Sequence, residues 1–320
     1  RIMTLWEKNG TKYTLNAIPF GGYVKIFGEN PDESSISGSD KDRSFVNKPK
    51  YWQAAVLVAG VTFNFLFAWL LISLGFISGL PTPVDYAGGE VRDAKVVITN
   101  IAPNTPASVS GIKAGDSIKS LSSGTDVLVK IEPSEVSNFI ASHSNEISFV
   151  VNRGKEIHTI KVTPVEGIVA GKKAIGISMD MIGILRLPIH KALWEGAKTT
   201  VNLTERTAVG LGQFLWSAVR GQANVSQVTG PVGIIGMVGD AEKLGFIYLL
   251  SFAAFISINL AVINLLPFPA IDGGRLIMVI IEVVSRKKIP SKVANTINAV
   301  GFILLLGLMV VVTIHDVIKL

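Results

Sequence analysis

Three long stretches without a charged residue limit most strongly what this chain can fold into. They cover residues 54–80, 246–271 and 293–314. Each is longer than the roughly 18 residues that mark a candidate membrane-spanning helix. The composition agrees, because 48% of the residues are hydrophobic and only 17% are charged. The sequence therefore predicts a polytopic α-helical membrane protein with three transmembrane helices in this chain.

A cluster of basic residues predicts the orientation of these helices. The short connection between the second and third stretches contains Arg286, Lys287, Lys288 and Lys292. Short loops rich in Lys and Arg stay on the cytoplasmic side of a membrane. We therefore expect residues 1–53 in the cytoplasm, and the long segment 81–244 and the C-terminus on the outer side. No basic stripe interleaved with aromatic residues occurs, so we expect no nucleic-acid partner.

The long outer segment begins with the pattern of a small β-rich domain. Residues 96–101, 147–151 and 157–162 are typical of strands, and residues 134–142 have helical spacing. Asn-Arg-Gly-Lys at 152–155 predicts the turn of a hairpin. The chain contains no cysteine, so the outer domain is not a disulfide scaffold.

The end of the outer segment has a different pattern. Residues 190–222 alternate apolar side chains with lysines, glutamates and arginines. This is typical of amphipathic helices that lie in the membrane surface. The charges at Glu195, Lys198, Glu205 and Arg206 argue against a fourth span.

A single carboxylate, Asp272, stands directly after the second apolar stretch. A carboxylate at membrane depth costs about 2.5–3.5 kcal/mol on insertion scales, and it usually pairs, lines a wet cavity or binds an ion. A structural ion pair and the proton relay of a transporter are the alternatives, and a transporter would have inverted repeats, which we do not detect. Pro267 and Pro269 should break the helix before Asp272, and Gly273 with Gly274 should permit a sharp turn.

Four motifs, taken together, resemble one family. Thr-Pro-Ala and Gly-Ile-Lys-Ala-Gly-Asp-Ser-Ile within 105–118 look like the bacterial PDZ pattern. Residues 264–274 resemble the Asn-x-x-Pro-x-Pro-x-x-Asp-Gly signature of the site-2 protease family, of the regulator-of-sigma-E protease type. Residues 16–25 resemble its Gly-Gly-Tyr-Val β-loop, and residues 59–65 its Ala-Gly-Pro-x-x-Asn-Phe segment, although Val61 replaces the proline. The four motifs follow the family's order and extend over most of the chain.

The resemblance implies an intramembrane zinc metalloprotease in which Asp272 is a metal ligand. It also implies substrate contacts for Asn264, Pro267, Pro269, Gly21, Gly22 and Tyr23. The β-loop that carries Tyr23 would pair with an extended substrate as an added strand, and an ordinary cytoplasmic ribbon is the alternative. For Asn264 the alternative is a simple hydrogen bond between helices.

The family's His-Glu-x-x-His motif is not in this chain, whose histidines are His143, His158, His190 and His315. Two histidines at i and i+4 lie on one face of a helix and can share a zinc ion, with the glutamate as general base. In the family this motif lies on the first transmembrane helix, before the β-loop. We therefore expect the motif upstream of Arg1, on one additional transmembrane helix that brings the total in the full protein to four. We expect residues 1–320 alone to be inactive.

The predicted organisation has seven segments. They are a cytoplasmic segment with a membrane-associated β-hairpin (1–53), a transmembrane helix (54–80), a PDZ-like domain (81–175), amphipathic interfacial helices (176–244), a transmembrane helix with the Asp-Gly motif (245–274), a cytoplasmic loop (275–292) and a transmembrane helix (293–320).

These expectations combine into one function. The protein would cut single-span membrane substrates, such as anti-sigma factors or remnant signal peptides, inside a lipid bilayer, the bacterial inner membrane. Its extracytoplasmic PDZ-like domain would either capture peptide tails or, as we favour, exclude substrates with bulky outer domains. The alternative function is a non-catalytic, membrane-anchored PDZ-type protein that binds peptides.

Overall fold

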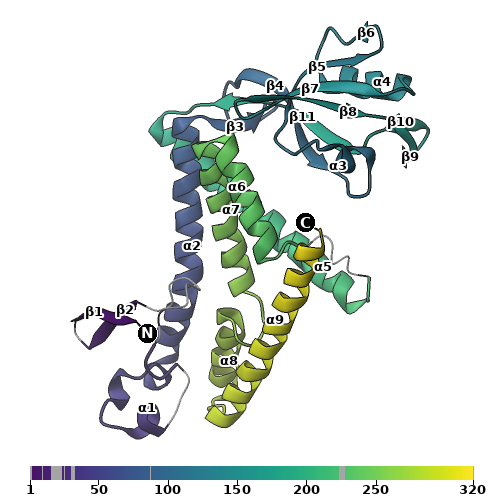
Figure 1. Ribbon diagram of the computed structural model, residues 1–320. Coiled ribbons are helices and arrows are strands. Elements are labelled where there is room, and N and C mark those ends of the chain that lie inside the picture. The colour runs from purple at the N-terminus through teal and green to yellow at the C-terminus, as the bar shows by residue number, and fades with distance from the viewer. Residues whose placement is uncertain are drawn as a thin grey trace.

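The structure is a computed structural model that describes residues 2–8, 10–15, 24, 26–29, 33–86, 88–222 and 228–319. Its helices form an elongated bundle, and a β-rich domain stands at one end of that bundle (Figure 1). A two-stranded hairpin and a short helix from the N-terminal part of the chain lie toward the other end.

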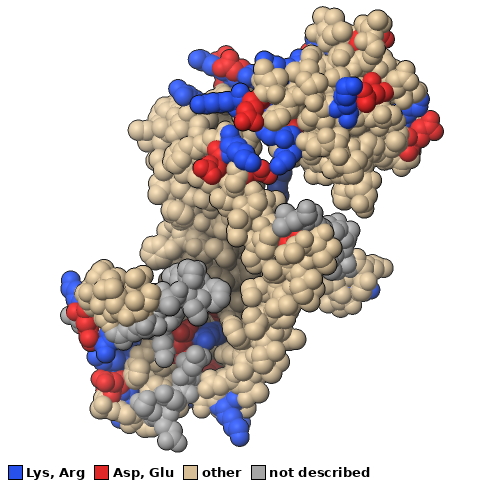
Figure 2. Space-filling view, in the orientation of Figure 1, with Lys and Arg blue, Asp and Glu red and all other residues tan. Residues whose placement is uncertain are grey.

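Three helices are long and apolar enough to cross a membrane. They are α2 (Lys50–Ser78), α7 (Phe246–Asn264) and α9 (Ser291–Lys319). Each overlaps one charge-free stretch, which confirms that part of the prediction. On the face seen in Figure 2, charged side chains gather over the β-rich domain and the N-terminal region, and few lie on the band between them. Such a band suits hydrocarbon, where charged side chains are costly.

Small and aromatic side chains hold α2 against α7. Ala68 and Phe76 of α2 are buried in one cluster with Ala254 and Ile258 of α7. Close approach of small residues is typical of helix pairs in membranes, where packing drives association. Many other apolar side chains of these two helices are exposed on the surface of the protein. Exposed apolar side chains are typical of helices that face lipid.

A further helix, α8 (Asp272–Ser285), lies in the bundle against α2. The cytoplasmic loop predicted for 275–292 is therefore wrong over its first half. Arg275 and Glu282 made that part look like a loop, but each forms an ion pair with a residue from another segment of the chain. The pairing allows these charges to remain on a packed helix.

The β-rich domain is built on a seven-stranded sheet in which neighbouring strands are antiparallel. Its strand order is β3-β11-β4-β5-β7-β8, with β6 paired to β5. The strands are β3 (Leu80–Pro83), β4 (Arg92–Ile101), β5 (Ser117–Ser123), β6 (Asp126–Val127), β7 (Ile147–Arg153), β8 (Glu156–Val162) and β11 (Ile177–Leu185). The three strands and the hairpin predicted within 96–162 are confirmed.

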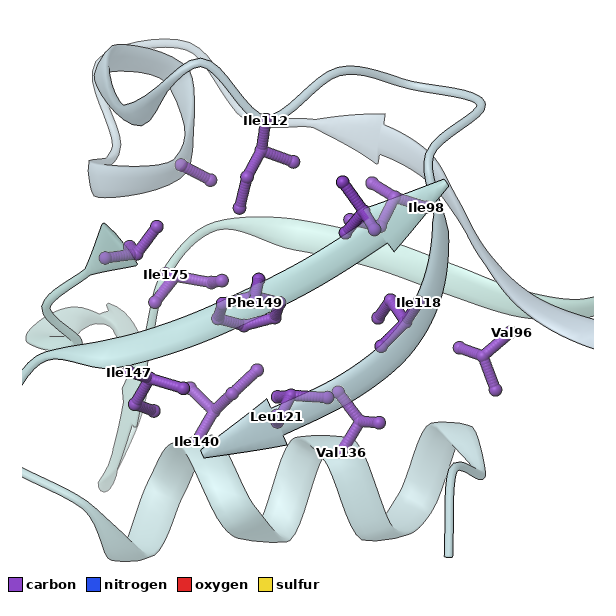
Figure 3. Packing of buried hydrophobic residues seen from close by; sticks show 13 residues of the cluster. Val96, Ile98, Ile112, Ile118, Leu121, Val136, Ile140, Ile147, Phe149 and Ile175 are labelled. Carbon is purple, nitrogen blue, oxygen red and sulfur yellow. The ribbon is translucent and has the colours of Figure 1, made fainter. Parts of the chain in front are cut away.

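Helix α4 (Pro133–Ser142) covers the core of this sheet (Figure 3). Val136 and Ile140 point from α4 toward Leu121 on β5 and Phe149 on β7, and all four are buried. The alternation of buried and half-buried residues along β7 gives the sheet its inner face. The remaining elements here are the short helix α3 (Pro106–Ser110) and the hairpin of β9 (Val165–Val169) and β10 (Lys172–Ala174).

The β-rich domain extends beyond its predicted end at residue 175. Strand β11 pairs with both β4 and β3, so it is an inner part of the sheet and does not belong with the helices that follow. The missed signal is a period of two at Ile177, Met179 and Met181, whose side chains pack on the domain's core.

The Gly-x-x-Gly-Asp turn of this domain is fixed by a buried carboxylate. Asp116 is fully buried, its Oδ2 accepts a hydrogen bond from the Lys113 amide at 2.9 Å, and its Oδ1 accepts one from Arg153 Nε at 2.7 Å. Arg153 Nη2 also donates to the Gly111 carbonyl at 2.8 Å. The hydrogen bond to Asp116 raises the pKa of Arg153. These residues stabilise the fold, because they join the turn to β7.

Two helices lead from the β-rich domain back to the bundle. They are α5 (Ile189–Val219) and α6 (Pro231–Leu244), and neither is among the candidate spans in the described part of the chain. Trp69 of α2 donates from Nε1 to the Leu193 carbonyl at 2.8 Å, and Tyr86 donates to Glu195 Oε2 at 2.9 Å. These bonds fix the start of α5 against α2 and against the entry to the sheet.

The N-terminal hairpin consists of β1 (Met3–Lys8) and β2 (Thr11–Leu15), with Trp6 stacked on Tyr13. It lies within segment 1–53, for which a β-hairpin is predicted, and its second strand ends just before the Gly-Gly-Tyr-Val loop. Most of that loop, including Gly21, Gly22 and Tyr23, is outside the described residues. The short helices α1 (Glu33–Ser37), η1 (Lys41–Arg43) and η2 (Phe45–Asn47) then lead into α2.

Candidate functional site

The candidate site is the connection between α7 and α8. Helix α7 ends at Asn264, and the amides of Leu265 and Leu266 donate back to Val262 and Ile263 at 3.1 and 3.0 Å in a closing turn. Pro267 has no amide hydrogen to continue this ladder, so the chain leaves the helix here. The break expected from the prolines is confirmed, and α8 begins at Asp272.

The two glycines after Asp272 have a different role from the one we predicted. Their backbone is helical and has no positive φ, so they do not form the sharp turn. They make room for main chain instead: a Cβ on Gly273 would lie 2.2 Å from the Leu266 carbonyl oxygen, and one on Gly274 would lie 2.0 Å from the Phe268 carbonyl oxygen. The turn therefore rests directly on the first turn of α8, and this contact fixes where Asp272 begins the helix.

The Asp272 carboxylate faces helix α2. A Cβ on Gly60 would lie 3.8 Å from Asp272 Oδ2, so this glycine leaves space in front of the carboxylate. Asp272 also occupies the first turn of α8, where the helix dipole favours a negative charge.

No described residue forms a hydrogen bond or an ion pair with the Asp272 carboxylate. A half-buried carboxylate whose oxygens accept no hydrogen bond from the described part of the chain is suited to hold a cation. Within the described ranges, no three His, Cys, Asp or Glu side chains are grouped to hold a metal ion. Asp272 is therefore the described carboxylate of this connection that could serve as one metal ligand.

A structural ion pair was the alternative explanation for Asp272, and Arg275 is the nearest basic residue along its helix. The Arg275 guanidinium pairs with Glu29, and its positive charge also attracts the Asp272 carboxylate. A second ion pair, between Lys50 and Glu282, joins α2 to α8. Sequence reasoning missed both pairs, because their partners lie more than 200 residues apart.

The predicted substrate-binding residues lie along the same connection where they are described. Asn264 is the last residue of α7, and its side chain makes no hydrogen bond to a described residue. The alternative role for Asn264, a hydrogen bond between helices, thus has no partner in this part of the structure. Pro267 is exposed, and Pro269 is half-buried against α9. Gly21, Gly22 and Tyr23 lie outside the described residues.

Comparisons with known proteins agree on one family. The sequence model of peptidase family M50 matches residues 1–308. A Clostridium perfringens protein with the words zinc metalloprotease in its name is 34% identical over 317 residues, which cover 96% of this chain and 84% of that protein. The regulator of sigma-W protease RasP of Bacillus subtilis is 30% identical, covering 89% of this chain and 64% of its own. The chloroplastic membrane metalloprotease ARASP of Arabidopsis thaliana is 30% identical over 330 residues, covering 100% of this chain and 70% of its own.

Proposed function

Because this chain belongs to peptidase family M50, the site-2 protease family of zinc metalloproteases, we propose that it hydrolyses peptide bonds of single-span membrane proteins within the bilayer. Anti-sigma factors and remnant signal peptides are the substrate classes that fit. The observation that carries the proposal is Asp272, a carboxylate that accepts no hydrogen bond from a described residue and is held at a break between two helices of a membrane bundle.

In this proposal Asp272 is the carboxylate ligand of a catalytic zinc ion. Such sites have three protein ligands and leave a position for water. When bound, the zinc ion activates this water and polarises the scissile carbonyl. The two remaining ligands and the general base would be the residues of a His-Glu-x-x-His helix, a motif that residues 1–320 do not contain.

Asn264 and the turn that follows it would hold the substrate. A helical substrate must unwind before cleavage, because its backbone amides are already hydrogen-bonded inward. The end of α7 offers main-chain groups that leave the helical ladder, together with the Asn264 amide. These groups support the binding of an extended backbone next to Asp272, and the loop with Gly21, Gly22 and Tyr23 would pair with its other edge.

The β-rich domain would face the outer side of the bacterial inner membrane and act as a size filter. Its contacts with the C-terminal end of α6 support this role. Lys113 Nζ lies 3.5 Å from Asp240 Oδ1, and a Cβ on Gly154 would lie 2.6 Å from the Lys243 carbonyl oxygen. A domain held this close to the helices would exclude substrates with large outer parts. Recruitment of trimmed peptide tails by a PDZ-like groove is the competing role.

One experiment distinguishes the protease from the alternative function, a non-catalytic peptide-binding protein. The purified full-length protein is incubated in detergent with a single-span substrate that lacks an outer domain, with and without a zinc chelator. We expect cleavage that the chelator abolishes and that added zinc restores. Binding of peptide tails without any cleavage would support the scaffold and would refute the protease.

A further inference from the structure

We propose that Asn298 of α9 is a positioning residue that holds the turn before α8, and so sets the direction of the Asp272 carboxylate. The inference rests on the proposed zinc site. It assigns a role in that site to α9, a helix that carries no predicted site residue.

The turn contains a residue in an unfavourable conformation. Ala270, two residues before Asp272, has φ of +75°, in the left-handed region. Glycine adopts this region freely, and Asn and Asp tolerate it through local hydrogen bonds, but alanine has neither advantage. The surrounding structure must therefore hold Ala270 in place.

Helix α9 contacts the turn around Ala270 at two points on one face of the helix, and these contacts hold Ala270 in its conformation. The amide of Ala270 donates a hydrogen bond to Asn298 Oδ1 at 3.3 Å. Three residues later, Gly301 lies against the main chain before Ala270: a Cβ on Gly301 would approach the Pro269 carbonyl oxygen to 2.7 Å. Residues at i and i+3 share a helix face. Asn298 and Gly301 thus contact two consecutive residues of the turn.

The space beside Ala270 explains why the hydrogen bond matters. A pocket of about 350 Å³ opens there, lined by Ala270, Arg275, Asn295, Asn298, Ala299 and Phe302. Because of this pocket, no closely packed side chains hold the turn in place on that side. Without Asn298, the peptide before Ala270 could rotate toward a more favourable φ, and because Ala270 is so near Asp272, this rotation would turn the carboxylate away from α2.

The test measures zinc retention in the full-length enzyme, so it does not depend on activity. EDTA is titrated against wild type, Asn298→Ala, Ala270→Gly and the double variant Asn298→Ala with Ala270→Gly. We expect Asn298→Ala to lower the EDTA concentration that removes half of the zinc by about fivefold, the ratio that corresponds to one ordinary hydrogen bond. The double variant should return to within about twofold of Ala270→Gly, because glycine adopts the left-handed conformation without help.

Asn295→Ala is the matched control, since Asn295 lines the same pocket one turn earlier, whereas the Ala270 amide donates to Asn298. Ala270→Gly should not rescue any loss that Asn295→Ala causes. Unchanged zinc retention in folded Asn298→Ala, or equal rescue of both asparagine variants, would overturn the proposal. If Asn298→Ala alone does not fold, the double variant must restore folding, and its failure to do so would also overturn the proposal. Absence of zinc from the wild type would instead refute the proposed function itself.

Discussion

Gly274 lies so close to Phe268 that a Cβ on the glycine would approach the Phe268 carbonyl oxygen to 2.0 Å. The turn after α7 and the first turn of α8 therefore share a surface that only a residue without a side chain permits. This contact fixes the start of α8, and with it the position of Asp272.

Gly274→Ala should push the turn off α8 and displace the carboxylate. Overpacking of this kind costs about 1–3 kcal/mol, and we expect activity and zinc content to fall together. Zinc analysis and thermal unfolding in detergent would measure both effects. Gly307→Ala on α9 is the matched control, because a Cβ there meets nothing within 4 Å. Equal behaviour of the two variants would refute the role of the close contact.

The ion pair between Lys50 and Glu282 should stabilise the contact of α2 with α8. Their side chains are only 27% and 14% exposed, whereas those of Lys161 and Glu146 in the β-rich domain are 65% and 55% exposed. A double-mutant cycle with Lys→Met and Glu→Gln should give a coupling of about 1–3 kcal/mol for the first pair and a clearly smaller coupling for the second, which water screens. The couplings are measured by denaturant unfolding. Equal couplings would refute the claim that the less exposed ion pair contributes more to stability.

Asp116→Ala should unfold or severely destabilise the β-rich domain. It removes the partner of Arg153 and the acceptor of the Lys113 amide, and loss of one member of a buried charge pair costs about 3–5 kcal/mol. Limited proteolysis of this domain should become much faster. Asp126→Ala provides the comparison, since the Asp126 side chain is 73% exposed. Similar proteolysis rates for the two variants would count against the structural role of Asp116.

Much of the fold follows from local patterns. The three candidate spans are visible as charge-free stretches, and the hairpin of β7 and β8 is visible in its alternation and its Gly154 turn. Strand β11 was missed because its alternation comes directly before a long amphipathic helix. Helix α8 was missed because its two charges look like loop residues until their partners are known.

The candidate site was predictable only in part, for a physical reason. Asp272 and the prolines can be recognised from residue type and local sequence alone. Asp272 is a carboxylate after an apolar stretch, and the prolines cannot continue a helix. Asn298 and Gly60 act through tertiary contacts, and their positions relative to Asp272 follow no local period. Gly273 and Gly274 were noticed, but their use for close approach depends on where the turn folds back.

The filter role of the β-rich domain is tested by breaking its contact with α6. A Cβ on Gly115 would lie 2.9 Å from Leu244 Cδ1, so Leu244→Arg should separate the two surfaces, and Asp240→Lys should add repulsion from Lys113. With both changes, we expect the full-length enzyme to cut a substrate that still has its bulky outer domain. Its rate on the trimmed substrate should stay within about twofold of wild type, a change of under about 0.5 kcal/mol. Loss of cleavage of the trimmed substrate alone would favour recruitment.

The central claim is that Asp272 is a zinc ligand, and metal analysis of the purified full-length protein tests it most directly. Asn is close to Asp in shape but lacks the charge, so Asp272→Asn should fold and insert normally while its zinc content falls well below the about one ion per chain expected for wild type. Cleavage of a membrane substrate should fall by at least about 100-fold. Wild-type zinc content together with wild-type cleavage in Asp272→Asn would remove Asp272 from the ligand set and contradict this account.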